Sequence, residues 1–529
     1  MEERERSAYV LDPWIIEALG WAVALLLAFL AVAHLDATDR SWILYYDPET
    51  MLPALVRGSV LAGEPQNWAL SAVLFIPEMA LYFALAALGL GIKGTFALNA
   101  VVNFLLLYGS LRLLSGLVRR ERSRGQRVAG ALLAFAGAVV LTCLEQSSRW
   151  DTFELVSLLA TATFYSMTVL ASVVTTGLVA PLAVTQTRRR RRWHGALLVA
   201  LAGLSTLTNP LYLAWEAVPL GLVLALLAWR RVVGWRTLLR VTAVLMVGGI
   251  IGLLARLPFA SLITKDGPAY AKPGLSAGTA VYYAQLLLDR TSTLEGAVSL
   301  ILVLALVLAS AFAFRHCVRS RDASAAVVAG MGWIAPVTVV VGAVFLGAVG
   351  TRYLQPVFFA PLCTLVLAPE LFARSRALRR ISQRGIQAVV AGVAVVCLTG
   401  SAVVTASLSN SSARIDADIR CVDSWILDSQ RVGAGRFWTI RGPKAYLSEP
   451  YRLIQVDDSF NAYPWLTDRS DYSNSKVSFV LSDNQYPPPA LPAAAGTAPH
   501  HSVSCGRYTI TDFGSDILPL GPGRPDSKP

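Results

Sequence analysis

Residues 34–78 read HLDATDRSWILYYDPETMLPALVRGSVLAGEPQNWALSAVLFIPE, and this stretch lies between two apolar segments of the chain. Its six carboxylates are spread along its length: Asp36, Asp39, Asp47, Glu49, Glu64 and Glu78. Carboxylates are costly next to a lipid bilayer, so acids in such a place mark a candidate functional site. What they face depends on the side of the membrane on which the stretch lies, and the rest of the chain decides that side.

The composition of the 529 residues is that of a membrane protein, because 55% are hydrophobic and 15% are charged. Soluble proteins are about a quarter charged, and several apolar runs here are long enough to cross about 30 Å of hydrocarbon. The formal net charge is +12, but the arginines fall in short clusters between apolar runs. The positive-inside rule explains that placement, so nucleic acid is not predicted as a partner. The six cysteines include no CxxC spacing, which argues against a zinc or thioredoxin-type site.

Five arginine-rich clusters determine the predicted topology. They lie at residues 119–127, 188–192, 230–240, 315–321 and 374–384. Between successive clusters lies enough apolar sequence for an outward and a returning helix, so all five clusters are predicted to be cytoplasmic. The predicted spans after the first cluster are residues 128–145, 155–185, 195–210, 214–229, 238–260, 297–314, 324–349, 353–372 and 387–405. The tail after residue 405 is then external.

The start of the chain adds an anchor helix at residues 15–33, because no small-residue cleavage site of a signal peptide is present. Residues 70–90 and 96–118 are both apolar enough to span the membrane. If both spanned it, the acidic stretch and the first arginine cluster would share a side, so we predict that residues 70–90 lie along the outer surface. Residues 1–405 thus form an all-α polytopic membrane domain with about eleven spans, a cytoplasmic N-terminus and an external acidic loop at residues 34–95.

Two more external parts are predicted. Residues 261–296 form the longest external loop inside the membrane domain, and their glycines and prolines favour a flexible cover over a packed element. Residues 406–529 have the composition of a soluble extracytoplasmic domain, in which one helix precedes the strand-like runs RFWTI, YRLIQVD, KVSFVLS and RYTITDF. This mixture predicts an α/β or α+β domain, and the last residues, GPGRPDSKP, are predicted to be disordered.

The soluble domain contains two cysteines, Cys421 and Cys505, in a compartment that is oxidising. Two free buried thiols are one possibility for this pair. We predict a disulfide instead, which would close a long loop and stabilise the domain.

Asp47 and Glu49 stand apart from the other acids because they lie in YYDPET, between aromatic residues and an amphipathic run. Carboxylates held at such a surface can act as a general base or bind a divalent cation. The other acids have a simpler interpretation, because external loops of membrane proteins are exposed to water and commonly carry acidic residues. That interpretation covers Glu64, Glu154 and Asp289.

Outside the cytoplasmic clusters, a few arginines lie at or near the outer end of a span: Arg57, Arg149, Arg256 and Arg352. The planar donors of arginine suit phosphate oxygens. The alternative is a side chain that snorkels to the interface or pairs with a nearby acid. Arg352 is the strongest candidate, because the motif TRYLQP places it beside Tyr353 and a proline.

These motifs together resemble the GT-C glycosyltransferases, the multi-spanning membrane enzymes that use polyprenyl-phosphate-linked sugars. Within them the chain looks most like the bacterial group related to protein mannosyltransferases and lipid A aminoarabinose transferases. The acidic motif and amphipathic helix of that group correspond to DPETMLPALVRGSVLAGEP, its short Ser-Arg-acidic loop to EQSSRWDTFE, and its late R-Y-x-x-P motif to TRYLQP. Two departures stand out, because the acidic pair is spread to D-P-E and the usual double proline before the surface helix is reduced to IPE.

The resemblance implies that Asp47 is the base, or the group that orients a metal or the acceptor, with Glu49 in support and Asp151 as a second acid. If a divalent ion such as Mg²⁺ or Mn²⁺ is needed, Asp47 and Asp151 would hold it, and no other cofactor is implied. The implied ligands of the donor phosphate are Arg352, Arg149, Arg57 and Tyr353. The implied supporting acids are Asp36, Asp39 and Glu78.

The resemblance therefore predicts transfer of a sugar, with inversion, from a polyprenyl-phosphate-linked donor to an envelope glycan, lipid or protein acceptor. The reaction would take place at the outer face of the plasma membrane. A transporter or flippase for a lipid-linked saccharide is an alternative, although transporters place polar groups at mid-membrane and often show internal repeats. A non-catalytic scaffold that binds the envelope is a third possibility.

Overall fold

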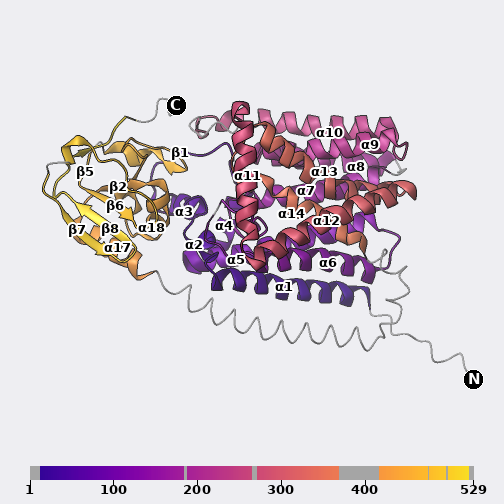
Figure 1. The fold of residues 1–529 in the computed structure, drawn as a ribbon, viewed down its shortest axis with the longest axis horizontal. Coiled ribbons are helices and arrows are strands. Elements are labelled where there is room, and N and C mark those ends of the chain that lie inside the picture. The colour runs from indigo at the N-terminus through magenta and orange to yellow at the C-terminus, as the bar shows by residue number, and fades with distance from the viewer. Residues whose placement is uncertain are drawn as a thin grey trace, which may run out of the picture.

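The computed structural model describes residues 12–149, 151–183, 188–264, 271–368, 416–474, 476–495 and 498–522. A body of long helices lies beside a smaller domain of strands and short helices (Figure 1). The long helices are α1 (Pro13–Ala37), α5 (Gly91–Val118), α6 (Arg124–Cys143), α8 (Arg188–Thr208), α10 (Trp235–Leu254), α12 (Leu294–Arg319) and α13 (Ala323–Phe345). The shorter helices among them are α7 (Ser166–Val179), α9 (Val218–Trp229) and α14 (Pro356–Thr364).

Seven segments in the described part of the chain have the length and hydropathy to cross a membrane. They confirm the prediction of a polytopic helical domain. The predicted span at residues 387–405 and the predicted boundary at residue 405 lie outside the described residues. The predicted span at residues 155–185 is wrong in its first part, because regular helix begins only at Ser166. Residues 155–165 form a short 3₁₀ turn and buried irregular backbone, and a continuous apolar run cannot distinguish such a segment from a helix.

Close helix contacts in the membrane domain depend on small residues. On α10, Gly248 and Gly252 are four positions apart and face α8, where a Cβ on Gly252 would lie 2.4 Å from the carbonyl oxygen of Gly203. This is the small-xxx-small arrangement through which helix backbones approach each other in lipid. On α1, buried alanines along one face serve the same purpose where this helix packs on α6.

The acidic stretch folds into short elements above the helical body: α2 (Ser41–Tyr45), α3 (Leu52–Ala62), β1 (Trp68–Ala69) and α4 (Ile76–Ala86). The eleven residues of α4 correspond to about 16 Å of helix. That length is about half of the hydrocarbon thickness, so α4 is too short to span the membrane.

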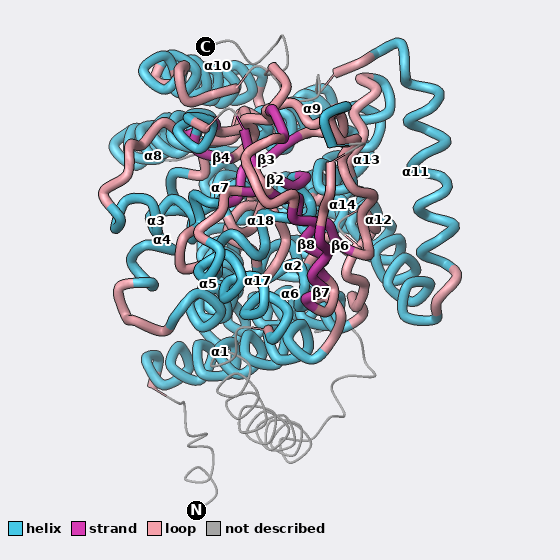
Figure 2. The backbone as a smooth tube through the Cα atoms, turned by 90° about the vertical axis from the view of Figure 1, so that its left-hand side faces the viewer, coloured by secondary structure: helices cyan, strands magenta, loops and turns pink. Residues whose placement is uncertain are grey.

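The predicted flexible loop at residues 261–296 contains α11 (Ser276–Thr291), a regular helix of 16 residues. The prediction of an irregular cover is therefore wrong for this half of the segment. Tyr283 and Leu286 of α11 are buried, and the hydroxyl of Tyr283 donates to the carbonyl oxygen of Ala348 at 2.9 Å. Figure 1 shows α11 lying across the long helices, and Figure 2 shows it on one side of the body.

The C-terminal domain is built on a mixed five-stranded sheet with the order β3-β2-β6-β8-β7. Its strands are β2 (Gly433–Arg436), β3 (Leu453–Val456), β6 (Phe479–Asp483), β7 (His501–Cys505) and β8 (Tyr508–Asp512). The pairs of β2 with β3 and β6 are parallel, and the others are antiparallel. Helices α17 (Ala417–Ser429) and α18 (Phe437–Tyr446) pack on this sheet. The predicted strand RFWTI is thus mostly helix, because only its first residue belongs to β2.

A disulfide joins Cys421 on α17 to Cys505 on β7, as predicted from the cysteine content and the external compartment. The two Cα atoms are 5.5 Å apart. The bond attaches the helix at the start of the domain to the last hairpin of its sheet.

The C-terminal domain is attached directly to the acidic stretch. Strand β1 pairs antiparallel with β4 (Thr467–Asp468), with Trp68 opposite Asp468. Arg469 donates to the carbonyl oxygen of Trp68 at 3.0 Å, and the amide of Arg469 bonds to the carbonyl oxygen of Asn67. The domain therefore rests on residues 34–95 and covers them on the side away from the long helices (Figure 1).

Candidate functional site

The acidic turn lies between α2 and α3, and its geometry follows from Asp47. One carboxylate oxygen of Asp47 accepts hydrogen bonds from the backbone amides of Glu49 at 3.0 Å and Thr50 at 3.1 Å. The intervening Pro48 cannot donate, so the Asp-Pro-Glu sequence folds into a tight turn held by the first side chain. Asp47 is 1% exposed. Burial raises the pKa of Asp47 to about 7, the charge of Glu49 acts in the same direction, and the amide bonds and Arg352 oppose the shift.

The second acid of the turn pairs with the predicted phosphate-binding arginine. Nη1 of Arg352 lies 2.5 Å from Oε1 of Glu49. Arg352 belongs to a 3₁₀ turn (Thr351–Leu354) that follows Gly350, whose φ of 142° is open only to glycine. The guanidinium lies over the rings of Phe164 and Tyr353, each 5.7 Å from the ring centroid. Two motifs that lie 303 residues apart in the chain thus form one partly buried ion pair.

The loop that follows α6 is held in place by Arg40, which is 1% exposed. Its guanidinium donates to the carbonyl oxygens of Ser147 and Arg149 at 2.9 and 2.8 Å, and Nη1 lies 3.4 Å from a carboxylate oxygen of Glu154. Glu154 also pairs with Arg290 of α11. The prediction that Glu154 is simply a solvent-exposed acid of a loop is therefore wrong, because this side chain is buried between two arginines. No motif pointed to Arg40, since its partners are backbone carbonyls from another part of the sequence.

The loop held by Arg40 presents Arg149 and Asp151 to the outside. Their side chains pair with each other, with Nε of Arg149 3.2 Å from Oδ1 of Asp151. Asp151 does not contact Asp47 directly, but both charges act on Tyr486 of the C-terminal domain, whose pKa is raised mainly by burial. Burial likewise raises the pKa of Tyr282 on α11 to about 12; Asp151 acts in the same direction, and arginines including Arg352 oppose it. The charges of Asp47 and Asp151 thus act on one side chain of the C-terminal domain, and those of Asp151 and Arg352 act on one side chain of α11.

The other predicted residues lie elsewhere in the acidic stretch, at residues 36, 39, 57 and 78. Arg57 on α3 donates to the carbonyl oxygen of Ala86 at 3.4 Å. Asp36 interacts with the side chain of Tyr45, whereas Asp39 is exposed at the end of α1. Glu78 is buried in the first turn of α4, where burial raises its pKa to about 7.

The residues that the structure describes include no group of three or more His, Cys, Asp or Glu side chains placed to hold a metal ion. Glu49 is already engaged by Arg352, and Asp151 by Arg149. The described side chains therefore do not form a prearranged metal site.

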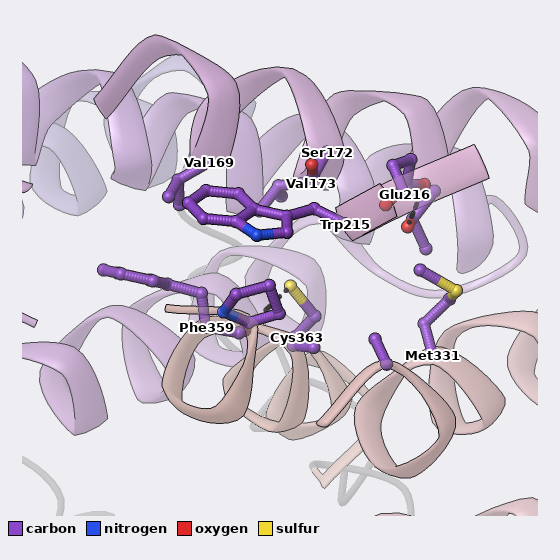
Figure 3. Close-up of a pocket in the computed structure, with 12 residues that line it drawn as sticks. Val169, Ser172, Val173, Trp215, Glu216, Met331, Phe359 and Cys363 are labelled. Carbon is purple, nitrogen blue, oxygen red and sulfur yellow. Dashed lines mark hydrogen bonds between the residues drawn. The ribbon is translucent and has the colours of Figure 1, made fainter. Parts of the chain in front are cut away.

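An apolar cavity lies inside the membrane domain between α7, α13 and α14 (Figure 3). The indole of Trp215 lies along it, with Phe359 and Cys363 on the opposite wall, and the carboxylate of Glu216 lies toward one end. Oε1 of Glu216 accepts a hydrogen bond from Thr176 at 2.9 Å. Nε1 of Trp215 donates to the carbonyl oxygen of Tyr353 at 2.9 Å, so the cavity is linked to the turn that carries Arg352.

No family model and no curated protein sequence matches this chain. Among solved structures, ArnT from Cupriavidus metallidurans, crystallised with undecaprenyl phosphate, aligns over 96% of this chain and 99% of its own length, with a TM-score of 0.52 and 15% sequence identity. An oligosaccharyltransferase from Archaeoglobus fulgidus in the apo form aligns over 89% of this chain and 70% of its own length, at 11% identity, but its TM-score of 0.43 is too low to carry an argument. The similarity to ArnT extends through the C-terminal domain, and it confirms the predicted architecture. The chain therefore has the fold of ArnT: a polytopic helical domain followed by a soluble domain that contains a sheet.

Proposed function

We propose that this protein transfers a sugar from a polyprenyl-phosphate-linked donor to an envelope glycan, lipid or protein acceptor at the outer face of the plasma membrane. The observation that carries the proposal is the buried carboxylate of Asp47 beside the Glu49–Arg352 pair, on a GT-C fold. The N-terminus would be cytoplasmic and the C-terminal domain external, in agreement with the five arginine clusters.

The chemistry that fits this site is a single displacement with inversion. The acceptor hydroxyl attacks the anomeric carbon, Asp47 takes the hydroxyl proton, and the bond from that carbon to the carrier phosphate oxygen breaks. A carboxylate with a pKa near 7 suits this role, because a general base works best when its pKa is near the working pH. The negative charge that develops on the phosphate would be stabilised by Arg352, which pairs with Glu49 next to Asp47.

The proposed donor site combines the turn around Arg352 with the apolar cavity below it. Arg352, Arg149, Arg57 and Tyr353 form the proposed set of phosphate ligands. The cavity of Figure 3 has mainly apolar walls, which suits the first isoprene units of a carrier lipid. Trp215 bridges the two parts through its hydrogen bond to Tyr353.

The decisive experiment is an Asp47→Asn variant, with Asp39→Asn as the matched control in the same stretch. Asn keeps the size of the side chain but cannot take the proton, so we expect a loss of sugar transfer of about 100-fold or more in membranes supplied with lipid-linked sugars. Asp39 is exposed and makes no contact with the acidic turn that is found among the described residues, so its variant should transfer normally. Normal transfer by Asp47→Asn at wild-type protein levels would exclude the proposed role of Asp47.

The buried Glu216 within the membrane domain favours transport of a lipid-linked saccharide as a second candidate function, because intramembrane acids often mark transport pathways. The same experiment separates the two functions. A transporter with Asp47→Asn would still deliver the lipid-linked sugar to the outer face, whereas the transferase variant would deliver none of it to an acceptor and would accumulate the donor.

A further inference from the structure

Helix α18 of the C-terminal domain contacts three backbone carbonyls at the end of α2 and in the acidic turn. The hydroxyl of Tyr446 donates to the carbonyl oxygen of Tyr45 at 2.7 Å. A Cβ on Gly442 would lie 2.8 Å from the carbonyl oxygen of Tyr46, so the helix backbone itself packs against that residue. Nε of Arg441 donates to the carbonyl oxygen of Pro48 at 3.0 Å.

Arg441 makes the most unusual of these contacts, because its charged side chain is completely buried. Apart from the bond to Pro48, its Nη1 and Nη2 atoms have no hydrogen-bond partner in the described part of the chain. The ring of Phe437 lies 5.7 Å from the guanidinium carbon. A buried cation that leaves two nitrogens without a hydrogen bond is costly unless nearby charges compensate for it.

The compensating charges lie in the acidic turn and in the C-terminal domain itself. Burial lowers the pKa of Arg441 to about 10, and the charges of Asp471, Glu49 and Asp47 oppose this shift, so the group is a cation at neutral pH. Asp471 already pairs with Lys444 at 2.5 Å, and Glu49 with Arg352 at the same distance. The charge of Asp47 acts on Arg441 less strongly than those of Asp471 and Glu49, but Asp47 has no ion-pair partner of its own among the described residues.

We propose that Arg441 is a positioning residue of the transfer site: it fixes the Pro48 carbonyl between the two acids and balances the charge of Asp47. The C-terminal domain is then a part of the site and not an independent module. This inference concerns how the acidic turn is held, and its role in transfer rests on the function proposed above.

A double-mutant cycle between Arg441 and Asp47 tests the charge coupling without any activity assay. The variants Arg441→Met and Arg441→Lys are made in the wild-type and Asp47→Asn proteins, and the melting temperature of each full-length protein is measured in detergent at pH 8. We expect Arg441→Met to lower the melting temperature, and to lower it less when Asp47 is Asn. Arg441→Lys, which keeps the charge, should recover part of the loss.

Arg452→Met is the matched control, because Arg452 lies in the same domain but pairs with Glu449. Its effect should be equal in the two backgrounds. If Arg441→Met lowers the melting temperature equally in both backgrounds, or if Arg441→Lys is no better than Arg441→Met, the proposal is wrong.

Transfer kinetics provide the second measurement. Misplacement of a catalytic group by about 1 Å can cost about 100-fold, so Arg441→Met should reduce kcat by that order while the KM for the lipid donor changes little. An unchanged kcat for Arg441→Met would also contradict the proposal. If Asp47→Asn transfers normally, the proposed function fails, but the melting cycle still decides whether Arg441 balances Asp47.

Discussion

At the scale of single residues, the structure separates two kinds of buried charge. Arg40 is satisfied by carbonyl oxygens and by Glu154, so its role is to shape the loop that follows α6. Asp47 accepts hydrogen bonds from the backbone amides of its own turn, and both of these amides donate to the same carboxylate oxygen, Oδ1. Asp47 and Arg352 were predictable from sequence because local motifs carry them. Arg40 and Arg441 were not, because each acts on a segment more than a hundred residues away.

The pKa of Asp47 leads to a prediction for the pH dependence of transfer. The base must be ionised to accept the acceptor proton, and burial raises its pKa to about 7. We expect kcat/KM to fall below pH 7 by about tenfold per pH unit and to level off above it. A pH–rate profile with its acidic limb near pH 4, the ordinary range of an aspartate, would contradict this assignment.

At the scale of elements, most spans were predictable because arginine clusters and apolar runs alternate along the chain. The wrong predictions for individual elements share one cause: the composition of a segment does not show which other segments pack against it. Residues 155–165 are apolar because they are buried, α11 is regular although glycines and prolines precede it, and α18 begins with β-favouring residues but lies on a sheet. Each of these elements borders the candidate site.

The contact between α8 and α10 yields a stability prediction. Gly252→Ala would place a Cβ 2.4 Å from the carbonyl oxygen of Gly203, so the helices must separate. We expect destabilisation of about 1–3 kcal/mol, the usual range for overpacking. Thermal unfolding in detergent measures the effect. Gly221→Ala on α9 is the control, because no atom lies within 4 Å of the added Cβ. This variant should have a melting temperature equal to or above that of the wild type. An equal loss of melting temperature in both variants would contradict the argument.

At the scale of the whole molecule, the candidate site is assembled from parts that are distant in the sequence. The acidic turn lies near the N-terminus, Arg352 comes after most of the described spans, and Arg441 belongs to the soluble domain. Sequence motifs could identify the first two as candidates but could not place them together. The similarity to ArnT covers nearly the whole chain, so the helical domain and the soluble domain occur together in both folds.

The disulfide links the stability of the soluble domain to the site beneath it. Cys421 and Cys505 are 84 positions apart, and closing a loop of that length contributes about 4 kcal/mol. We expect Cys421→Ser to lower the unfolding temperature of the C-terminal domain and, because α18 holds the acidic turn, to reduce transfer at elevated temperature. Cys143→Ser removes a free cysteine and is the control. Equal heat sensitivity of wild type and Cys421→Ser would refute this link.

The pairing of β1 with β4 has a consequence for the order of synthesis. The hydrogen bond between Asn67 and Asp468 joins residues 401 positions apart. At about 5–20 residues per second, a ribosome needs about 20–80 s to produce the second strand after the first. During that interval the nascent chain has its acidic turn but neither β4 nor α18 to hold it. The protein therefore cannot complete its site until α18 and β4 have been synthesised, and chains that terminate before them would lack both contacts.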